Sequence, residues 1–254
     1  MAVGPLYPIQ VPVMPIRAEA RDASEMVTQG LAGELVEWLE AGERDWVRVR
    51  CAWDGYEGWC DLKQLSQVPE NHSDREFLLT QSLTCFDRID DGATLWLSMG
   101  CRLAVASEED GSYCLGGWTL SIRGVLPSGA PDPVAAAESL LGVPYLWGGR
   151  SATGVDCSGL VQLVFGLTGI KLPRDASQQI AVGAEVELGK VERGDLAFFA
   201  NDQGAIVHVG ILCSPVEILH AAGEVRRDTF SPAGIVHAIS GVLTHALAGV
   251  RRVR

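Results

Sequence analysis

Cys157 stands at the start of an apolar segment, in a position that favours nucleophilic chemistry. The segment 155–165 opens with Asp156, a residue type that caps helices, and then continues almost wholly apolar. We therefore predict a buried helix with Cys157 at its N-terminal end. Unpaired N–H groups and the helix dipole at such an end favour the thiolate and should lower the pKa of the thiol. The alternative interpretation is a core cysteine that merely begins a helix.

Two of the five histidines lie in neighbouring β-prone segments downstream of Cys157. His208 lies in the apolar run 205–212 and His220 in the run 216–221, with a turn-prone Cys-Ser-Pro between them. Antiparallel pairing of these runs would place both imidazoles on one face. A thiolate nucleophile needs a base and a group that orients the base. One histidine on a strand is more often structural, so the catalytic hypothesis depends on the pair.

The N-terminal half shows short β-prone runs separated by turns. Residues 45–51 read Asp-Trp-Val-Arg-Val-Arg-Cys, the alternation of a half-buried strand, and Asp54-Gly55 is a hairpin signal. A second series of such runs occupies residues 101–122. Strands of this length and spacing predict two small barrels, the first at residues 1–68 and the second, inferred mainly from length and spacing, at 69–128.

Composition and charge narrow the classes of partner. Of the 254 residues, 47% are hydrophobic and 20% charged, as in an ordinary globular protein, and the length predicts more than one domain. The formal net charge is −12. Such a surface repels phosphate backbones, so we expect no nucleic-acid partner. A small or zwitterionic substrate remains compatible, and oligomeric state is not predicted.

The seven cysteines and the N-terminal segment indicate a reducing compartment. An odd count with irregular spacing predicts neither a disulfide framework nor a zinc site, and we expect no metal and no cofactor. Four prolines interrupt the first 25 residues and no basic residue precedes the apolar stretch, so a secretory signal is not predicted. No run of about 18 apolar residues occurs, so no membrane span is expected. We predict a cytoplasmic protein.

Six ordered motifs in residues 129–254 resemble the NlpC/P60 family of cysteine peptidases. They are Tyr145-Leu-Trp-Gly-Gly149, Asp156-Cys-Ser-Gly159, Leu172-Pro-Arg-Asp175, Gly194-Asp-Leu-Ala-Phe-Phe199, His208-Val-Gly-Ile211 and Ile218-Leu-His-Ala221. The resemblance implies an α+β, papain-like catalytic domain at 129–254, with the nucleophile on a helix packed against an antiparallel sheet. It implies Cys157 as nucleophile, His208 as general base, His220 as the residue that orients the base, and Tyr145 as a group that stabilises the oxyanion or positions substrate.

The segment from Asp45 to Trp59 resembles a bacterial SH3 domain. Together the two halves resemble SH3–NlpC/P60 endopeptidases that cleave γ-D-glutamyl–diamino acid bonds of murein peptides with a free N-terminal L-Ala. That resemblance implies a set of substrate-binding residues: Asp156, Ser158, Tyr56, one acid from Asp54 or Glu57, Trp147 and Ser177. Structural alternatives stay open: Asp156 as a helix cap only, Ser158 as a first-turn residue only, Trp147 as an aromatic core plug, and Arg174 with Asp175 as a structural ion pair.

Two other functions remain in competition with a murein-peptide recycling enzyme. One is a broader, exported cell-wall hydrolase that uses its SH3 domains to bind the intact wall; the acidic balance disfavours it. The other is a non-enzymatic adaptor whose SH3 modules bind peptides; the complete set of Cys157, His208 and His220 disfavours it.

Overall fold

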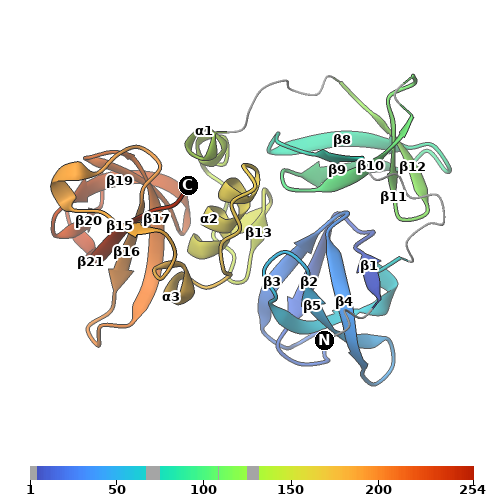
Figure 1. The fold of residues 1–254 in the computed structure, drawn as a ribbon, viewed down its shortest axis with the longest axis horizontal. Helices are drawn as coiled ribbons and strands as arrows, with labels where there is room; N and C mark the ends of the chain where they lie inside the picture. The colour runs from blue at the N-terminus through green and yellow to red at the C-terminus, as the bar shows by residue number, and fades with distance from the viewer. Residues whose placement is uncertain (1–4, 67–74, 108, 125–131) are drawn as a thin grey trace. The chain divides into compact units, whose positions relative to one another are not determined.

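The structure is a computed structural model that describes residues 5–66, 75–107, 109–124 and 132–254 (Figure 1). The chain divides into two compact units, Met1–Gly129 and Ala130–Arg254. The domain boundaries predicted at 68/69 and 128/129 lie outside the described residues.

Two antiparallel sheets of six strands make up the N-terminal unit. The first contains β1 (Leu6–Pro8), β2 (Val13–Arg17), β3 (Met26–Leu31), β4 (Leu35–Ala41), β5 (Trp46–Cys51) and β6 (Glu57–Asp61), followed by the 3-10 helix η1 (Leu62–Gln64). The second contains β7 (Glu76–Leu78), β8 (Leu83–Arg88), β9 (Thr94–Ser98), β10 (Arg102–Ser107), β11 (Ser112–Leu115) and β12 (Trp118–Ile122). Their strand orders, β1-β4-β5-β6-β2-β3 and β7-β10-β11-β12-β8-β9, follow one and the same topology.

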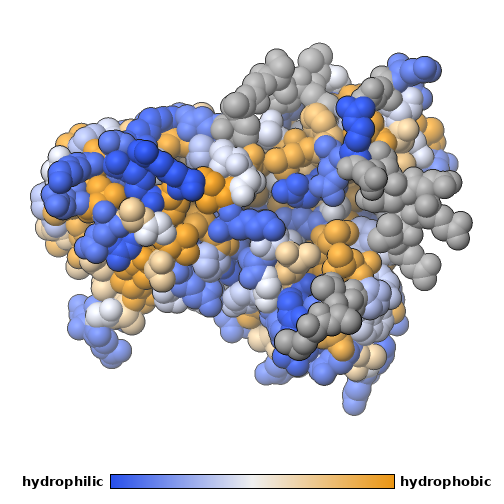
Figure 2. All heavy atoms as spheres, viewed as in Figure 1, coloured by the Kyte–Doolittle hydropathy of each residue, from blue (hydrophilic) through white to orange (hydrophobic). Residues whose placement is uncertain are grey.

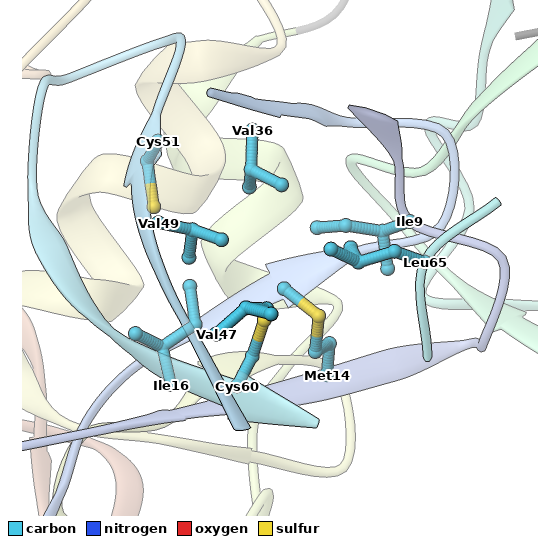
Figure 3. Close-up of a cluster of buried hydrophobic side chains, with 9 residues drawn as sticks. All are labelled: Ile9, Met14, Ile16, Val36, Val47, Val49, Cys51, Cys60 and Leu65. Atoms are coloured by element: carbon cyan, nitrogen blue, oxygen red, sulfur yellow. The ribbon is translucent and has the colours of Figure 1, made fainter. Parts of the chain in front are cut away.

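The core of the first sheet follows from period-2 alternation. In β5, Val47, Val49 and Cys51 are buried, whereas the residues between them are half-buried. Nine buried side chains converge in this core (Figure 3): Ile9, Met14, Ile16, Val36, Val47, Val49, Cys51, Cys60 and Leu65. The predicted turn between β5 and β6 is confirmed, because Gly55 adopts φ 76° and the Cys51 N–H donates to the Tyr56 carbonyl (2.8 Å).

The C-terminal unit combines short helices with a seven-stranded sheet. Its helices are α1 (Pro133–Glu138), α2 (Cys157–Gly166), α3 (Ala176–Gln179) and the 3-10 helix η2 (Leu188–Lys190). A two-stranded sheet, β13 (Arg150–Ser151) with β14 (Gly154–Val155), precedes α2. The large sheet contains β15 (Ala184–Glu185), β16 (Leu196–Ala200), β17 (Ile206–Ser214), β18 (Glu217–Ala222), β19 (Glu224–Ser231), β20 (Gly234–Val236) and β21 (Leu243–Arg252). Because β21 also pairs with β20, the order β15-β21-β16-β17-β18-β19-β20 closes on itself.

Helix α2 packs against β17 and β18, so its predicted burial is confirmed. It begins at Cys157 with Asp156 as N-cap, and every residue except its last is buried. The chain therefore has the predicted fold class, an all-β N-terminal unit followed in sequence by an α+β unit. All seven cysteines are described, and none is in a disulfide.

The visible surface mixes hydrophilic and hydrophobic residues (Figure 2). Within the four described ranges, no helix is long and apolar enough to cross a membrane.

Candidate active site

Cys157 is the first residue of α2, and the loop that precedes the helix packs closely against the first turn of α2. The Asp156 N–H donates to the Gly149 carbonyl (3.0 Å), which ties the helix to the preceding loop. A Cβ placed on Gly159 would lie 2.1 Å from that same carbonyl oxygen. The first turn of α2 therefore requires glycine at position 159. This close packing of loop and helix holds the backbone of Cys157 in position.

A buried ionic cluster holds the N-cap in place. Both Asp156 and Arg174 are buried, and the guanidinium contacts the carboxylate at both oxygens, Nη1 to Oδ1 at 3.0 Å and Nη2 to Oδ2 at 2.5 Å. Arg174 Nη1 also donates to Ser158 Oγ (2.9 Å), whose hydroxyl lies 3.3 Å from Asp156 Oδ1. Such a bidentate arginine–carboxylate pair has a specific geometry and strong hydrogen bonds.

The Asp156 carboxylate has its acceptor capacity fully used. Backbone N–H groups of Gly159 (2.7 Å) and Gly148 (2.9 Å) donate to it, in addition to Arg174 and Ser158. A carboxylate offers about four lone-pair sites, and five donor contacts already surround this one. The predicted capping of the helix by Asp156 is confirmed. Contact of Asp156 or Ser158 with a substrate ammonium stays a prediction, and it requires displacement of one of these donors.

The expected low pKa of the nucleophile is wrong for this structure. Cys157 is 7% exposed, and burial, with Asp156 beside it, raises the pKa of the thiol to about 11. The backbone N–H groups of Val209, on β17, and of Ser158, at the helix start, lower the pKa of the thiol, but burial outweighs them. In the absence of substrate, the cysteine is a neutral thiol.

The predicted pairing of the two histidines is confirmed. Antiparallel pairing of β17 and β18 places His208 Nε2 2.8 Å from His220 Nδ1, with His208 6% and His220 1% exposed. Beyond them, His220 Nε2 lies 3.0 Å from Oδ2 of Asp228 on β19. The thiol of Cys157 interacts with the backbone N–H of Val209, the neighbour of His208. The side chains of His208, His220 and Asp228 thus form a line across β17, β18 and β19, and the Cys157 thiol lies against the backbone of β17 next to His208.

A third histidine, His245 of β21, stacks on His208. Their ring centroids lie 4.3 Å apart at 25°, and Phe199 flanks both rings at 5.9 and 6.0 Å. Burial, followed by the charges of His220 and His245, lowers the pKa of His208 well below its usual value. Burial also lowers the pKa values of His220 and His245. At neutral pH His208 is therefore uncharged and able to accept a proton.

The remaining predicted residues of this unit differ in exposure. Tyr145 is half-buried, and burial together with Cys157 raises the pKa of its hydroxyl to about 12, so it stays a proton donor close to the thiol. Trp147 is 62% exposed, so the core-plug alternative is wrong. Ser177 is exposed on α3. Arg174, predicted to form a structural ion pair with Asp175, is paired with Asp156.

The three predicted residues of the N-terminal unit lie around the β5–β6 turn. Tyr56 packs against the core of the first sheet, and its N–H donates to Asp54 Oδ1 (2.9 Å). Glu57 accepts from Arg48 (2.9 Å) and Arg50 (2.8 Å). The Glu57 charge is therefore paired with two guanidinium groups. Substrate contact by Tyr56 and by one acid, Asp54 or Glu57, stays a prediction.

Sequence reasoning missed Asp228, His245 and the partner of Arg174. The sequence did contain one signal for Asp228. It lies two residues before Phe230 on the same strand and so faces the same, buried side of the sheet, where a charged side chain is costly unless it has a partner. In the part of the chain that the structure describes, no group of three or more His, Cys, Asp or Glu side chains is arranged to hold a metal ion.

Comparisons with known proteins decide the family. The model of the NlpC/P60 family matches residues 142–243, and that of the bacterial dipeptidyl-peptidase Sh3 domain matches residues 16–65. A γ-D-glutamyl-L-lysine dipeptidyl-peptidase of Bacillus subtilis (strain 168) is 32% identical over 212 residues, which cover 76% of this chain and 71% of that protein. The chain belongs to the NlpC/P60 family. As an NlpC/P60 member it is a cysteine peptidase, and the adaptor alternative is disfavoured.

Two further NlpC/P60 relatives come from one Bacillus cereus strain, ATCC 10987. A protein of the same printed name, γ-D-glutamyl-L-lysine dipeptidyl-peptidase, is 29% identical over 248 residues, which cover 83% of this chain and 72% of that protein. A crystal structure of an NlpC/P60 family protein superposes with a TM-score of 0.81 at 24% identity, covering 97% of this chain and 99% of that one. The latter likeness shows that the fold extends over both units.

Proposed function

We propose that this NlpC/P60 peptidase hydrolyses the γ-D-glutamyl–diamino acid bond of murein peptides that carry a free N-terminal L-Ala. The observation that carries the proposal is the agreement of two relatives, at 29% and 32% identity and with more than 70% of each covered, on a γ-D-glutamyl-L-lysine dipeptidyl-peptidase name. Cys157, beside the backbone of Val209, and the hydrogen-bonded pair of His208 and His220 supply the groups that such a reaction requires.

The protonation states of the site favour general-base activation during attack over a preformed ion pair. Burial keeps both the Cys157 thiol and the His208 imidazole neutral. As the sulfur attacks the γ-glutamyl carbonyl, the S–C bond forms and the thiol proton passes to His208. Backbone N–H groups at the start of α2 and the Tyr145 hydroxyl would stabilise the oxyanion.

Collapse of the tetrahedral intermediate uses the same histidine in the opposite direction. The C–N bond breaks, and the imidazolium of His208 gives its proton to the leaving amine of the diamino acid. Water then attacks the thioester carbonyl while His208 takes up a proton from it, so that a C–O bond forms. The C–S bond breaks, and the imidazolium returns its proton to the Cys157 sulfur, which restores the thiol. The released acyl product is L-Ala-γ-D-Glu.

The cellular role proposed is recycling of released murein peptides in the cytoplasm. A requirement for a free L-Ala amine would exclude stems still attached to the glycan, so the enzyme would act after an amidase. The proposed amine-binding residues are Asp156, Ser158, Tyr56 and one acid, Asp54 or Glu57. Trp147 and Ser177 are the proposed lining of the cleft. Because the Asp156 carboxylate already accepts from several donors, binding of the amine by this group requires displacement of one of them.

Mass spectrometry of the products from L-Ala-γ-D-Glu-diamino acid peptides tests this function. We expect L-Ala-γ-D-Glu from free tri- and tetrapeptides and none with Cys157→Ala or His208→Ala. N-acetylation of L-Ala should lower kcat/KM on the order of a hundredfold, because it removes the charge that a carboxylate would bind. Equal rates on both peptides, together with digestion of intact sacculi, would replace the proposal with the broader exported hydrolase.

A further inference from the structure

Asp228 is a buried carboxylate at the far end of the histidine pair. Its side chain is 2% exposed, and Oδ2 lies 3.0 Å from His220 Nε2. Oδ1 accepts from the Ala238 N–H (2.7 Å) and from Arg226 Nη2 (3.1 Å). The carboxylate is therefore fixed in position by a backbone amide and a guanidinium, independently of the histidine.

The contact between Asp228 and His220 determines which nitrogen of each histidine, His220 and His208, carries the proton. An ionised carboxylate only accepts hydrogen bonds, so His220 must carry its proton on Nε2. Neutral His220 then has its lone pair on Nδ1, which lies 2.8 Å from His208 Nε2. His208 Nε2 must in turn be the protonated nitrogen. The nitrogen of His208 left with a lone pair is Nδ1.

We propose that Asp228 is a positioning residue of the peptidase site, which through His220 makes Nδ1 the basic nitrogen of His208. The proposal deepens the proposed function, since it assumes that His208 is the base. Asp228 touches neither the thiol nor the substrate. Its role is to select one tautomer of each histidine and to hold both rings in the orientation that this tautomer requires.

The same arrangement favours the charged intermediate. When His208 Nδ1 takes the thiol proton, both of its nitrogens become donors, and neutral His220 still accepts from Nε2. The negative charge of Asp228 then lies one ring beyond the new cation. Arg226 and the stacked His245 also face this group of side chains, and Arg226 offsets part of the carboxylate charge.

Long-range ¹H–¹⁵N spectra of the full chain, labelled at histidine, test the tautomers without any substrate. We expect His208 and His220 both as Nε2–H forms at pH 7–8, with signals assigned by their loss in His208→Gln and His220→Gln. In Asp228→Asn, the new amide can donate to His220 Nε2, so part or all of the Nε2–H population of both rings should be lost. An Nδ1–H form of either ring in the parent protein overturns the proposal, even if the variant does not fold.

Kinetics of the folded variants provide the second measurement. Asp228→Asn should lower kcat on a γ-glutamyl peptide by about a hundredfold or more, the range of general-base catalysis, with little change in KM. The matched control is Asp195→Asn, since Asp195 is 1% exposed and pairs with Arg252 at 2.7 Å in the same unit. The control should lose stability but keep kcat and both tautomers. Folded Asp228→Asn with kcat within threefold of the parent, or an equal loss of kcat in the control, would refute the role.

Discussion

Replacing Arg174 with Met should cost this protein more stability than an ordinary surface charge substitution. The guanidinium is 2% exposed and accounts for two of the five donor contacts to the Asp156 carboxylate. Its loss leaves a buried carboxylate with three neutral donors. Breaking a buried pair from one side costs about 3–5 kcal/mol, a large share of the roughly 5–15 kcal/mol that stabilises a typical protein.

A double-mutant cycle separates the charge effect from lost packing. Asp156→Asn should also be costly, because it leaves Arg174 buried without its anion. Arg174→Met with Asp156→Asn removes both charges, so the double variant should be more stable than the sum of the single losses predicts. We expect a coupling free energy of about 3 kcal/mol.

Hydrogen exchange of peptides covering α2, measured across a urea series, reports the free energy of unfolding of this unit alone. The matched control is Arg193→Met, because Arg193 pairs with Asp132 at 2.8 Å but both side chains are about half exposed. That change should cost no more than about 1 kcal/mol. A loss below about 1 kcal/mol for Arg174→Met, or no measurable coupling, would show that the cluster does not anchor the helix start.

Three further outcomes follow from the geometry. Gly159→Ala should severely destabilise the protein, because the new Cβ would lie 2.1 Å from a backbone oxygen. In Gly166→Ala, in the same helix, the new Cβ meets open space, so this variant should be neutral or stabilised by up to about 1 kcal/mol. Urea denaturation of both variants measures the difference. The rate at which iodoacetamide alkylates Cys157 should rise as the pH is raised from 6 to 9, because burial raises the pKa of the thiol. Peptide mass spectrometry measures this rate. A rate independent of pH between 5 and 7 would instead indicate a thiolate–imidazolium pair. The free energy of unfolding should fall as the pH drops below about 6.5. His208, His220 and His245 have lowered pKa values in the folded state, so the unfolded chain binds more protons there. Each histidine contributes up to about 1.4 kcal/mol per pH unit. Urea midpoints measured from pH 7.5 to 5 check this, and a flat profile would contradict it.

Local rules were sufficient for the elements that present the nucleophile and the base. Asp156 followed by an apolar run predicted both the start and the burial of α2, because capping and hydrophobicity act within one helix. Two apolar, β-prone runs joined by a short turn predicted the β17–β18 hairpin and the meeting of His208 with His220.

What sequence reasoning missed depends on contacts between distant segments. Arg174 reaches Asp156 across 18 positions, and His245 meets His208 only because β21 closes the sheet against β16 and β20. The pKa of Cys157 was mispredicted for a related reason. The helix start was recognised, but the degree of desolvation around one sulfur atom depends on how the whole sheet covers it.

The common strand order of the two N-terminal sheets has an evolutionary consequence. Identical topology in tandem is the pattern that duplication of one ancestral module would produce, with each copy able to change separately afterwards. The turn between β5 and β6 spans residues 52–56 and carries Tyr56, whereas the equivalent β11–β12 turn is reduced to Gly116-Gly117. At this turn the first module thus offers residues that, apart from Gly55, can present side chains, whereas the second offers two glycines that have none, so a division of labour between the two copies would begin here.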